Sequence, residues 1–181
     1  MKPKQPKVTL EINEGFARWS DVPFEDLVEP ALSVLLQNLN LPVISVSVLL
    51  TDDETISGLN EEFRGNGKAT NVLSWPAQRY DNPPDALHPF VTRPDLVPEV
   101  GDIALAFETI CEEATAAGIP RDDHIIHLTL HGVLHCLGFD HQTDETAHYM
   151  EGIERKILVR IGIPDPYSGS EVIEAKEPNG T

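Results

Sequence analysis

A chain of 181 residues with 40% hydrophobic and 24% charged residues has the size and composition of one soluble globular domain. It contains no apolar stretch of the roughly 18 residues that cross a membrane. The N-terminal MKPKQPK lacks the apolar core of a secretory signal, so we expect a frayed tail there. The two cysteines are too few for a disulfide framework, which favours a reducing cytoplasm. The net charge of −17 is the reverse of the basic composition typical of nucleic-acid-binding proteins.

The spacing of apolar residues predicts the secondary structure, because alternation indicates a strand and a repeat of three to four residues indicates a helix. Capping residues and glycines then mark where the helices begin and end. The first predicted elements are a strand over Val8–Asn13, a helix over Pro23–Asn40, a strand over Val43–Leu50, a helix from Thr51 to about Phe63 and a strand over Thr70–Trp75. The later ones are a strand over Asp102–Phe107 and helices over Thr109–Ala117, Arg121–Leu137 and Thr143–Ile161.

Two segments lack such spacing. Residues 76–98 hold six prolines and no repeat, so we expect a long loop there and no domain boundary. The chain is rich in Pro, Gly and Glu near its end, and we expect residues 166–181 to be a disordered tail. We expect residues 1–165 to form a single domain of the α+β class, with a mixed sheet of about four strands packed with helices.

Five of the seven histidines lie within Arg121–His141. At about 100° per residue, the helix HIIHLTLHGVLHCL carries an apolar stripe, with a stripe of histidines roughly a quarter turn away. One histidine beside an apolar face is usually a packed core residue, but four on one stripe indicate a site. The four histidines are His124, His127, His131 and His135.

His131 and His135 are one helical turn apart and can bind one ion, since zinc lies about 2.0–2.1 Å from imidazole nitrogens. His127 is about 12 Å along the axis from His135, too far to join both. We expect His141 as the third ligand, because Gly138 can adopt the left-handed conformation that ends a helix and lets the chain fold back. Three imidazoles favour one zinc per chain and leave a fourth position for water, as in catalytic sites.

The spacing H-x3-H-x5-H, with a glycine three residues after the second histidine, matches the ligand pattern of the metzincin proteases. Those proteases carry a glutamate after the first histidine as general base, where this chain has Gly132. A metallopeptidase is therefore disfavoured, because the carboxylate that activates water is missing.

Other polar residues lie near the motif. Asp140 is a candidate to orient a ligand imidazole, with a turn-forming role as the alternative, and His127 either bonds near the site or lines it. Cys136 points away from the histidine stripe, so we expect it to pack in the interior. His88 and His148 are expected to be surface histidines.

Three segments, in order along residues 43–160, resemble the YbeY family. His131-Gly-Val-Leu-His-Cys-Leu-Gly-Phe-Asp-His141 is similar to the family signature H-G-x-L-H-x-x-G-Y/F-D-H. Leu59-Asn-Glu-Glu-Phe-Arg-Gly65 with Thr70-Asn-Val-Leu-Ser-Trp75 resembles L-N-x-x-Y/F-R-G with T-D/N-V-L-S-F, and Gly101-Asp102-Ile103 resembles the G-D-I strand. Residues 76–98 look longer and richer in proline than the family's usual connection.

The resemblance implies a bacterial or organellar metalloprotein of ribosome maturation. Its expected activity is that of a single-strand-specific endoribonuclease, which helps form the 3′ end of small-subunit ribosomal RNA and takes part in ribosome quality control. It implies that Arg64 is the functional arginine near the metal and that Ser74 and Asp102 face the cleft. The expected partners are single-stranded ribosomal RNA and the ribosome or its proteins, with no DNA and no membrane. The zinc ligands it implies are His131, His135 and His141.

The residues are compatible with phosphodiester cleavage, because a metal ion stabilises charge on the phosphoryl oxygens. A glutamate base is not required, since a metal can lower the pKa of its bound water to about 7. Arg64 would pair with such an oxygen through its planar guanidinium, although a salt bridge to Glu61 or Glu62 is the simpler alternative. A different function class is a zinc-containing assembly factor with little catalysis, which the acidic composition favours because it suits basic ribosomal proteins. Acidic residues are few between Arg64 and Arg93, so a locally basic cleft is compatible with the net charge.

Overall fold

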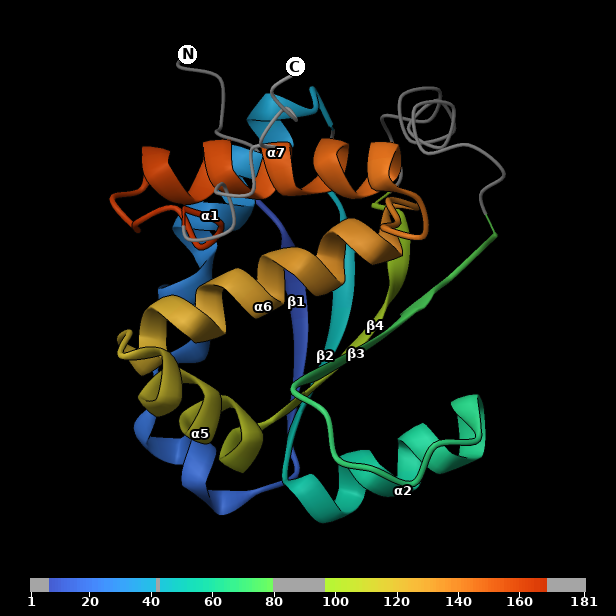
Figure 1. The fold of residues 1–181 in the computed structure, drawn as a ribbon. Helices are drawn as coiled ribbons and strands as arrows, with labels where there is room; N and C mark the ends of the chain where they lie inside the picture. Colours follow the sequence, from blue (N-terminus) through green and yellow to red (C-terminus); the bar gives the residue numbers. More distant parts are fainter. Residues whose placement is uncertain (1–6, 42, 80–96, 169–181) are drawn as a thin grey trace, which may run out of the picture.

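A four-stranded mixed sheet lies at the centre of the fold (Figure 1). The structure is a computed structural model that describes residues 7–41, 43–79 and 97–168. The strands are β1 (Thr9–Glu14), β2 (Ser45–Thr51), β3 (Val72–Pro76) and β4 (Glu99–Ala106), in the order β1-β2-β4-β3. β1, β2 and β4 are parallel, whereas β3 is antiparallel to β4 and forms an edge. The predicted α+β class with a mixed sheet is therefore confirmed.

Helices connect the strands and follow them in the C-terminal half. Side chains cap two of the helix starts: Asp52 Oδ1 accepts a hydrogen bond from Thr55 N at 2.8 Å, and Thr143 forms a capping box with Thr146. The helices are η1 (Ala17–Asp21, a 3-10 helix), α1 (Phe24–Asn38), α2 (Asp53–Arg64), α5 (Phe107–Ala117), α6 (Arg121–Cys136) and α7 (Asp144–Arg160).

The two faces of the sheet are covered by different helices, because successive strand residues point to opposite sides. One face carries the large apolar core, to which α1, α5, α6 and α7 contribute side chains. α6 runs across this face against β3 and β4 (Figure 1). The opposite face carries α2, whose Ile56 packs with Leu73, Ala104 and Ala106. α2 and α6 therefore lie on opposite faces of the sheet, next to its edge strand β3.

One observed element is absent from the prediction, and several boundaries differ from the predicted ones. The sequence pattern does not predict η1, since five residues carry no periodicity; the helix forms around Trp19, which is fully buried and donates its indole N–H to Thr51 O at 2.9 Å. β4 begins at Glu99, three residues before the predicted start. α5 begins at Phe107, directly after β4, because Phe107 packs edge-on against Trp19 with ring centroids 5.1 Å apart.

Some predictions fall outside the described residues. The loop predicted over 76–98 is described only at its two ends, and His88 lies outside the described ranges, as do residues 169–181 of the predicted tail. Residues 166–168 of that tail are described, and Tyr167 hydrogen bonds to Glu154 of α7, so packed chain extends past the predicted boundary at 165. Within the described chain, no helix is long and apolar enough to cross a membrane.

Candidate metal centre

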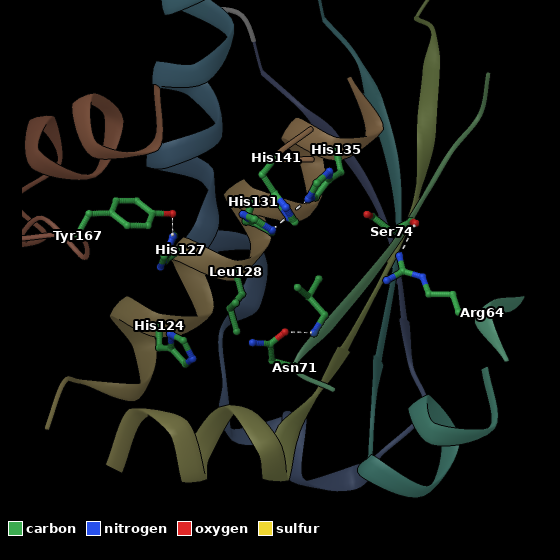
Figure 2. A pocket seen from close by; sticks show the side chains of 11 residues that line it. Arg64, Asn71, Ser74, His124, His127, Leu128, His131, His135, His141 and Tyr167 are labelled. Carbon is green, nitrogen blue, oxygen red and sulfur yellow. Dashed lines mark hydrogen bonds between the residues drawn. The ribbon is translucent and has the colours of Figure 1, made fainter. Parts of the chain in front are cut away.

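The histidine stripe of α6 faces a cavity of about 450 Å³ between this helix and β3 (Figure 2). All four predicted histidines of the stripe line it, and Val72 and Ser74 of β3 form the facing wall. Arg64 and Tyr167 also border the cavity, from α2 and from the segment after α7. On its other side α6 is anchored in the core, where Leu134 is fully buried. The helix thus presents imidazoles to the cavity from a fixed position.

The chain folds back after α6 as the glycine predicts. Gly138 has a φ of 92°, and its N–H donates to His135 O at 2.9 Å, which closes the helix end. The carboxylate of Asp140 accepts a hydrogen bond from the backbone N–H two residues later, so this side chain forms a turn. The turn returns His141 to His131, and the two rings stack with centroids 5.5 Å apart and planes at 24°.

His131, His135 and His141 each bring one ring nitrogen to a common point. These ligand atoms all lie within 4.8 Å of one another, and the Nε2 atoms of His131 and His135 are 3.1 Å apart. The three predicted ligands are therefore brought together, two from α6 and one from the following turn (Figure 2). His131 and His135 are half-buried and His141 is exposed, which leaves the point accessible from the cavity.

The partners of the other ring nitrogens determine which nitrogens can bind a metal. His131 Nδ1 lies 2.7 Å from Glu154 Oε1, and His135 Nδ1 lies 2.9 Å from Phe139 O. Both partners are acceptors, so each Nδ1 carries the proton and each Nε2 presents a lone pair. Two lone pairs facing each other at 3.1 Å repel unless a cation lies between them. The donor set therefore fits a metal ion that binds imidazole nitrogen.

The charge of His135 is suppressed by its surroundings. Burial disfavours the imidazolium form, and the neighbouring His131 and His141 add positive charge, which together lower the pKa of His135 from 6.5 to about 4. A neutral imidazole is the form that binds metal.

Glu154 of α7 is the site residue that the sequence analysis missed. Its side chain has no exposed surface. Burial alone would raise its pKa, but hydrogen bonds from His127, His131 and Tyr167 outweigh that effect and lower it from 4.5 to about 2. Glu154 therefore stays ionised and orients His131, the role the sequence suggested for Asp140. A signal was present, because Glu154 lies on the apolar face of α7 that includes Met150 and Ile157.

His127 lines the cavity and also forms a bond near the site. Its Nε2 lies 3.2 Å from Glu154 Oε2 and 3.2 Å from the hydroxyl of Tyr167. Farther along the cavity, His124 Nε2 lies 2.8 Å from Glu113 Oε2, which also accepts a hydrogen bond from Asn71 at 2.9 Å. Both histidines are thus tied to carboxylates and not to the point where the three ligands meet.

Arg64 is the last residue of α2, and Gly65 ends the helix with a φ of 66°. The guanidinium points toward the cavity and donates from Nη2 to Ser74 O at 3.5 Å (Figure 2). Within the described chain it forms no salt bridge to Glu61 or Glu62. A guanidinium that is exposed, and that pairs with no carboxylate of the described residues, is available to an anion in the cavity.

Asp102 does not face this cavity, which corrects the expectation from the resemblance. It pairs with Trp75 on the α2 side of the sheet, where it lines a separate cavity with Phe63. The next residue of β4 faces α6, so the alternation of the strand turns Asp102 away from the histidines. Cys136 is fully buried, as expected for a packing residue, and His148 is an exposed surface histidine.

Gly132 lies where α6 meets the sheet, at the position of the protease glutamate. A Cβ atom there would lie 3.1 Å from Ile103 Cγ2 and 3.2 Å from Val72 Cγ2. These separations are tighter than ordinary van der Waals contact, so a side chain at residue 132 would require Ile103 and Val72 to shift. The close packing is consistent with the absence of the metzincin carboxylate at this position.

Comparisons with known proteins identify the family of this chain. The family described as "Endoribonuclease YbeY" matches residues 11–162. A relative of that name from Jannaschia sp. is 46% identical over 151 residues, which cover 82% of this chain and 93% of the relative. Another from Dinoroseobacter shibae is 44% identical over 174 residues, 92% of this chain and 95% of the relative.

One solved structure supports the fold alone. A Thermotoga maritima protein whose structure was determined in solution is similar with a TM-score of 0.52 and 21% identity, and the match covers 96% of this chain and 100% of that protein. The family match over residues 11–162 and the two relatives give one assignment. This chain belongs to the YbeY endoribonuclease family.

Proposed function

We propose that this chain is a zinc-dependent endoribonuclease that cleaves single-stranded RNA. Its proposed task is maturation of the 3′ end of small-subunit ribosomal RNA and ribosome quality control, in the cytoplasm. Membership of the family supports the nuclease activity, since the relatives are named as endoribonucleases. The observation that carries the proposal is the convergence of three histidine nitrogens within 4.8 Å beside a cavity that Arg64 borders.

The residues of the site have distinct proposed roles. His131, His135 and His141 would hold the zinc, which supplies Lewis-acid stabilisation of charge on phosphoryl oxygens. Glu154 holds His131 by its Nδ1–H, so the ring presents Nε2 in one orientation. Arg64 would donate two parallel N–H groups to two oxygens of the phosphate and so position the scissile bond.

The charge of the cavity supports RNA as the substrate despite the acidic chain. Of the 30 acidic residues in the sequence, none is among the described residues that line the cavity, which instead include Arg64 and five histidines. Two carboxylates lie directly behind this lining: Glu113 Oε2 is 2.8 Å from His124 Nε2, and the buried Glu154 Oε1 is 2.7 Å from His131 Nδ1. Both carboxylates bond to cavity histidines, whereas the Arg64 guanidinium at the border is exposed and can attract a phosphate. A cavity bordered by Arg64 is compatible with a net charge of −17.

The net charge also supports a second candidate function. A chain with charge −17 attracts basic ribosomal proteins, so an assembly factor in which zinc serves stability is the alternative. A metallopeptidase has no such support, because Gly132 occupies the position of the catalytic carboxylate and its close contact with Ile103 and Val72 disfavours a larger side chain.

A cleavage assay separates these functions. Zinc-loaded protein is incubated with single-stranded RNA, the same sequence as a duplex, single-stranded DNA and casein, each with and without a chelator. Cleavage of single-stranded RNA alone, lost with chelator and restored by zinc, is the expected result. Cleavage of casein would indicate a peptidase, and no cleavage of any substrate would favour the assembly factor.

A further inference from the structure

The segment after α7 folds back and brings Tyr167 to the buried carboxylate of Glu154. Arg155 forms an ion pair with Asp165 at 2.7 Å, and the other carboxylate oxygen of Asp165 accepts a hydrogen bond from Tyr167 N at 2.9 Å. The hydroxyl of Tyr167 then donates to Glu154 Oε2. Because Glu154 and Arg155 are neighbours on α7, the returning segment is attached at one place on the helix.

Tyr167 completes the set of donors around Glu154. The carboxylate has no exposed surface, and its Oε1 accepts a hydrogen bond from His131 Nδ1 at 2.7 Å. Its Oε2 lies 3.2 Å from His127 Nε2 and also accepts from Tyr167. A buried carboxylate needs several donors to remain ionised and fixed. Burial and the charge of Glu154 raise the pKa of Tyr167, so the phenol keeps the proton that it donates.

We propose that Tyr167 is a positioning residue of the histidine site: by holding Glu154 Oε2 it fixes Oε1 against His131 Nδ1 and keeps His131 Nε2 aimed at the metal. The proposal rests on the proposed function, since the role of His131 as a ligand belongs to it. Tyr167 lies beyond residues 11–162, the part that matches the family. Its ring also borders the cavity, 5.7 Å from the ring of His127 (Figure 2).

The first test compares two tyrosine variants of the full chain by zinc affinity, measured by competition with a chromophoric chelator. Tyr167→Phe removes only the hydroxyl, and we expect about 10-fold weaker zinc binding, the low end of the effect of removing a ligand's outer partner. Tyr149→Phe is the matched control, because Tyr149 lies on α7 and is 55% exposed. The zinc affinity of this variant should equal that of the wild type. Equal affinities of the two variants would overturn the proposal.

A double-mutant cycle tests whether Tyr167 acts through Glu154. Glu154→Gln should weaken zinc binding by about 10–100-fold, since it removes the charged partner of His131. If Tyr167 acts only through this carboxylate, adding Tyr167→Phe to Glu154→Gln causes no further loss. Losses that multiply in the double variant would contradict this route and overturn the proposal.

A third measurement does not depend on zinc. In the metal-free protein, nitrogen NMR of the imidazoles should show His131 protonated at Nδ1, and a mixture of the two tautomers in Tyr167→Phe. An unchanged tautomer in the variant would overturn the positioning role even if the melting temperature fell. If the wild-type chain bound no zinc, the proposed function would fail, while the tautomer measurement would still decide the role of Tyr167.

Discussion

The three histidines differ in how firmly the fold holds them. His131 and His135 each have Nδ1 bound to an acceptor on another part of the chain, whereas His141 is exposed and is placed by the turn after Gly138. We expect replacement of any of the three by Ala to abolish zinc binding, because two imidazoles and water make a much weaker site than three. Elemental analysis of the purified variants measures the zinc content.

The control for these variants is His148→Ala, an exposed histidine whose Nδ1 bonds to Asp144 O. It should retain one zinc per chain. Full zinc occupancy in His141→Ala would show that the turn does not supply a ligand.

Arg64 tests the cavity without touching the metal ligands. Arg64→Ala should leave zinc content and melting temperature nearly unchanged, since exposed substitutions usually stay within about 0.5 kcal/mol. RNA cleavage should fall by roughly 10²–10³-fold, the effect of removing one preorganised donor to the transition state. Arg64→Lys should restore only part of the rate, because an ammonium cannot form the two-pronged contact. A wild-type rate in zinc-loaded Arg64→Ala would refute the catalytic role.

The residues of the site that the sequence predicted are those related by local spacing. His131, His135 and His141 are fixed by one helical turn and one glycine, so the pattern alone brings them together. Glu154 bonds to His131 across 23 residues, and Tyr167 reaches Glu154 from a segment predicted to be a tail. Such contacts depend on how α7 packs on α6, which no local pattern specifies.

At the scale of the elements, the contact of α6 with the sheet depends on Gly132. We expect Gly132→Glu to destabilise the fold by about 3 kcal/mol or more, because the side chain would meet Ile103 and Val72 and bury a carboxylate without a partner. Urea unfolding measures the loss. The matched control is Gly152→Glu on α7, where a Cβ atom meets nothing within 4 Å, and we expect a change within about 0.5 kcal/mol.

If both glutamate variants unfolded at the same urea concentration, the close contact at Gly132 would not limit the packing of α6. Equal stability would also reopen the question of why the protease carboxylate is missing.

The predicted bounds of the elements agree with the structure where the apolar residues follow a single strand or helix spacing. The bounds differ where one element leads directly into the next. The alternation in β1 and the β-branched run in β2 predict strands within two residues of the observed bounds. The apolar run around Phe107 fits a strand end or a helix start, and only its packing on Trp19 decides for the start of α5. Local patterns thus determine the type of an element, and tertiary contacts set its ends.

For the whole molecule, two titratable groups, the half-buried His135 and the buried Glu154, link stability to pH. The pKa of His135 is lowered from 6.5 to about 4, and the pKa of Glu154 is lowered from 4.5 to about 2. In both cases the unfolded chain binds more protons than the folded chain between the two values. The free energy of unfolding of the metal-free protein must therefore fall as pH falls, through His135 between pH 6.5 and 4 and through Glu154 between pH 4.5 and 2.

Urea unfolding of metal-free protein at pH 7, 5.5 and 4.5 measures the upper of these windows. His135→Ala removes the group that titrates there, so its stability should depend less steeply on pH than that of the wild type over this range. His148→Ala, which changes an exposed histidine, should follow the wild-type curve. Parallel curves for wild type and His135→Ala would mean that the folded chain tolerates a proton on His135. The site would then not hold that imidazole neutral in advance of the metal.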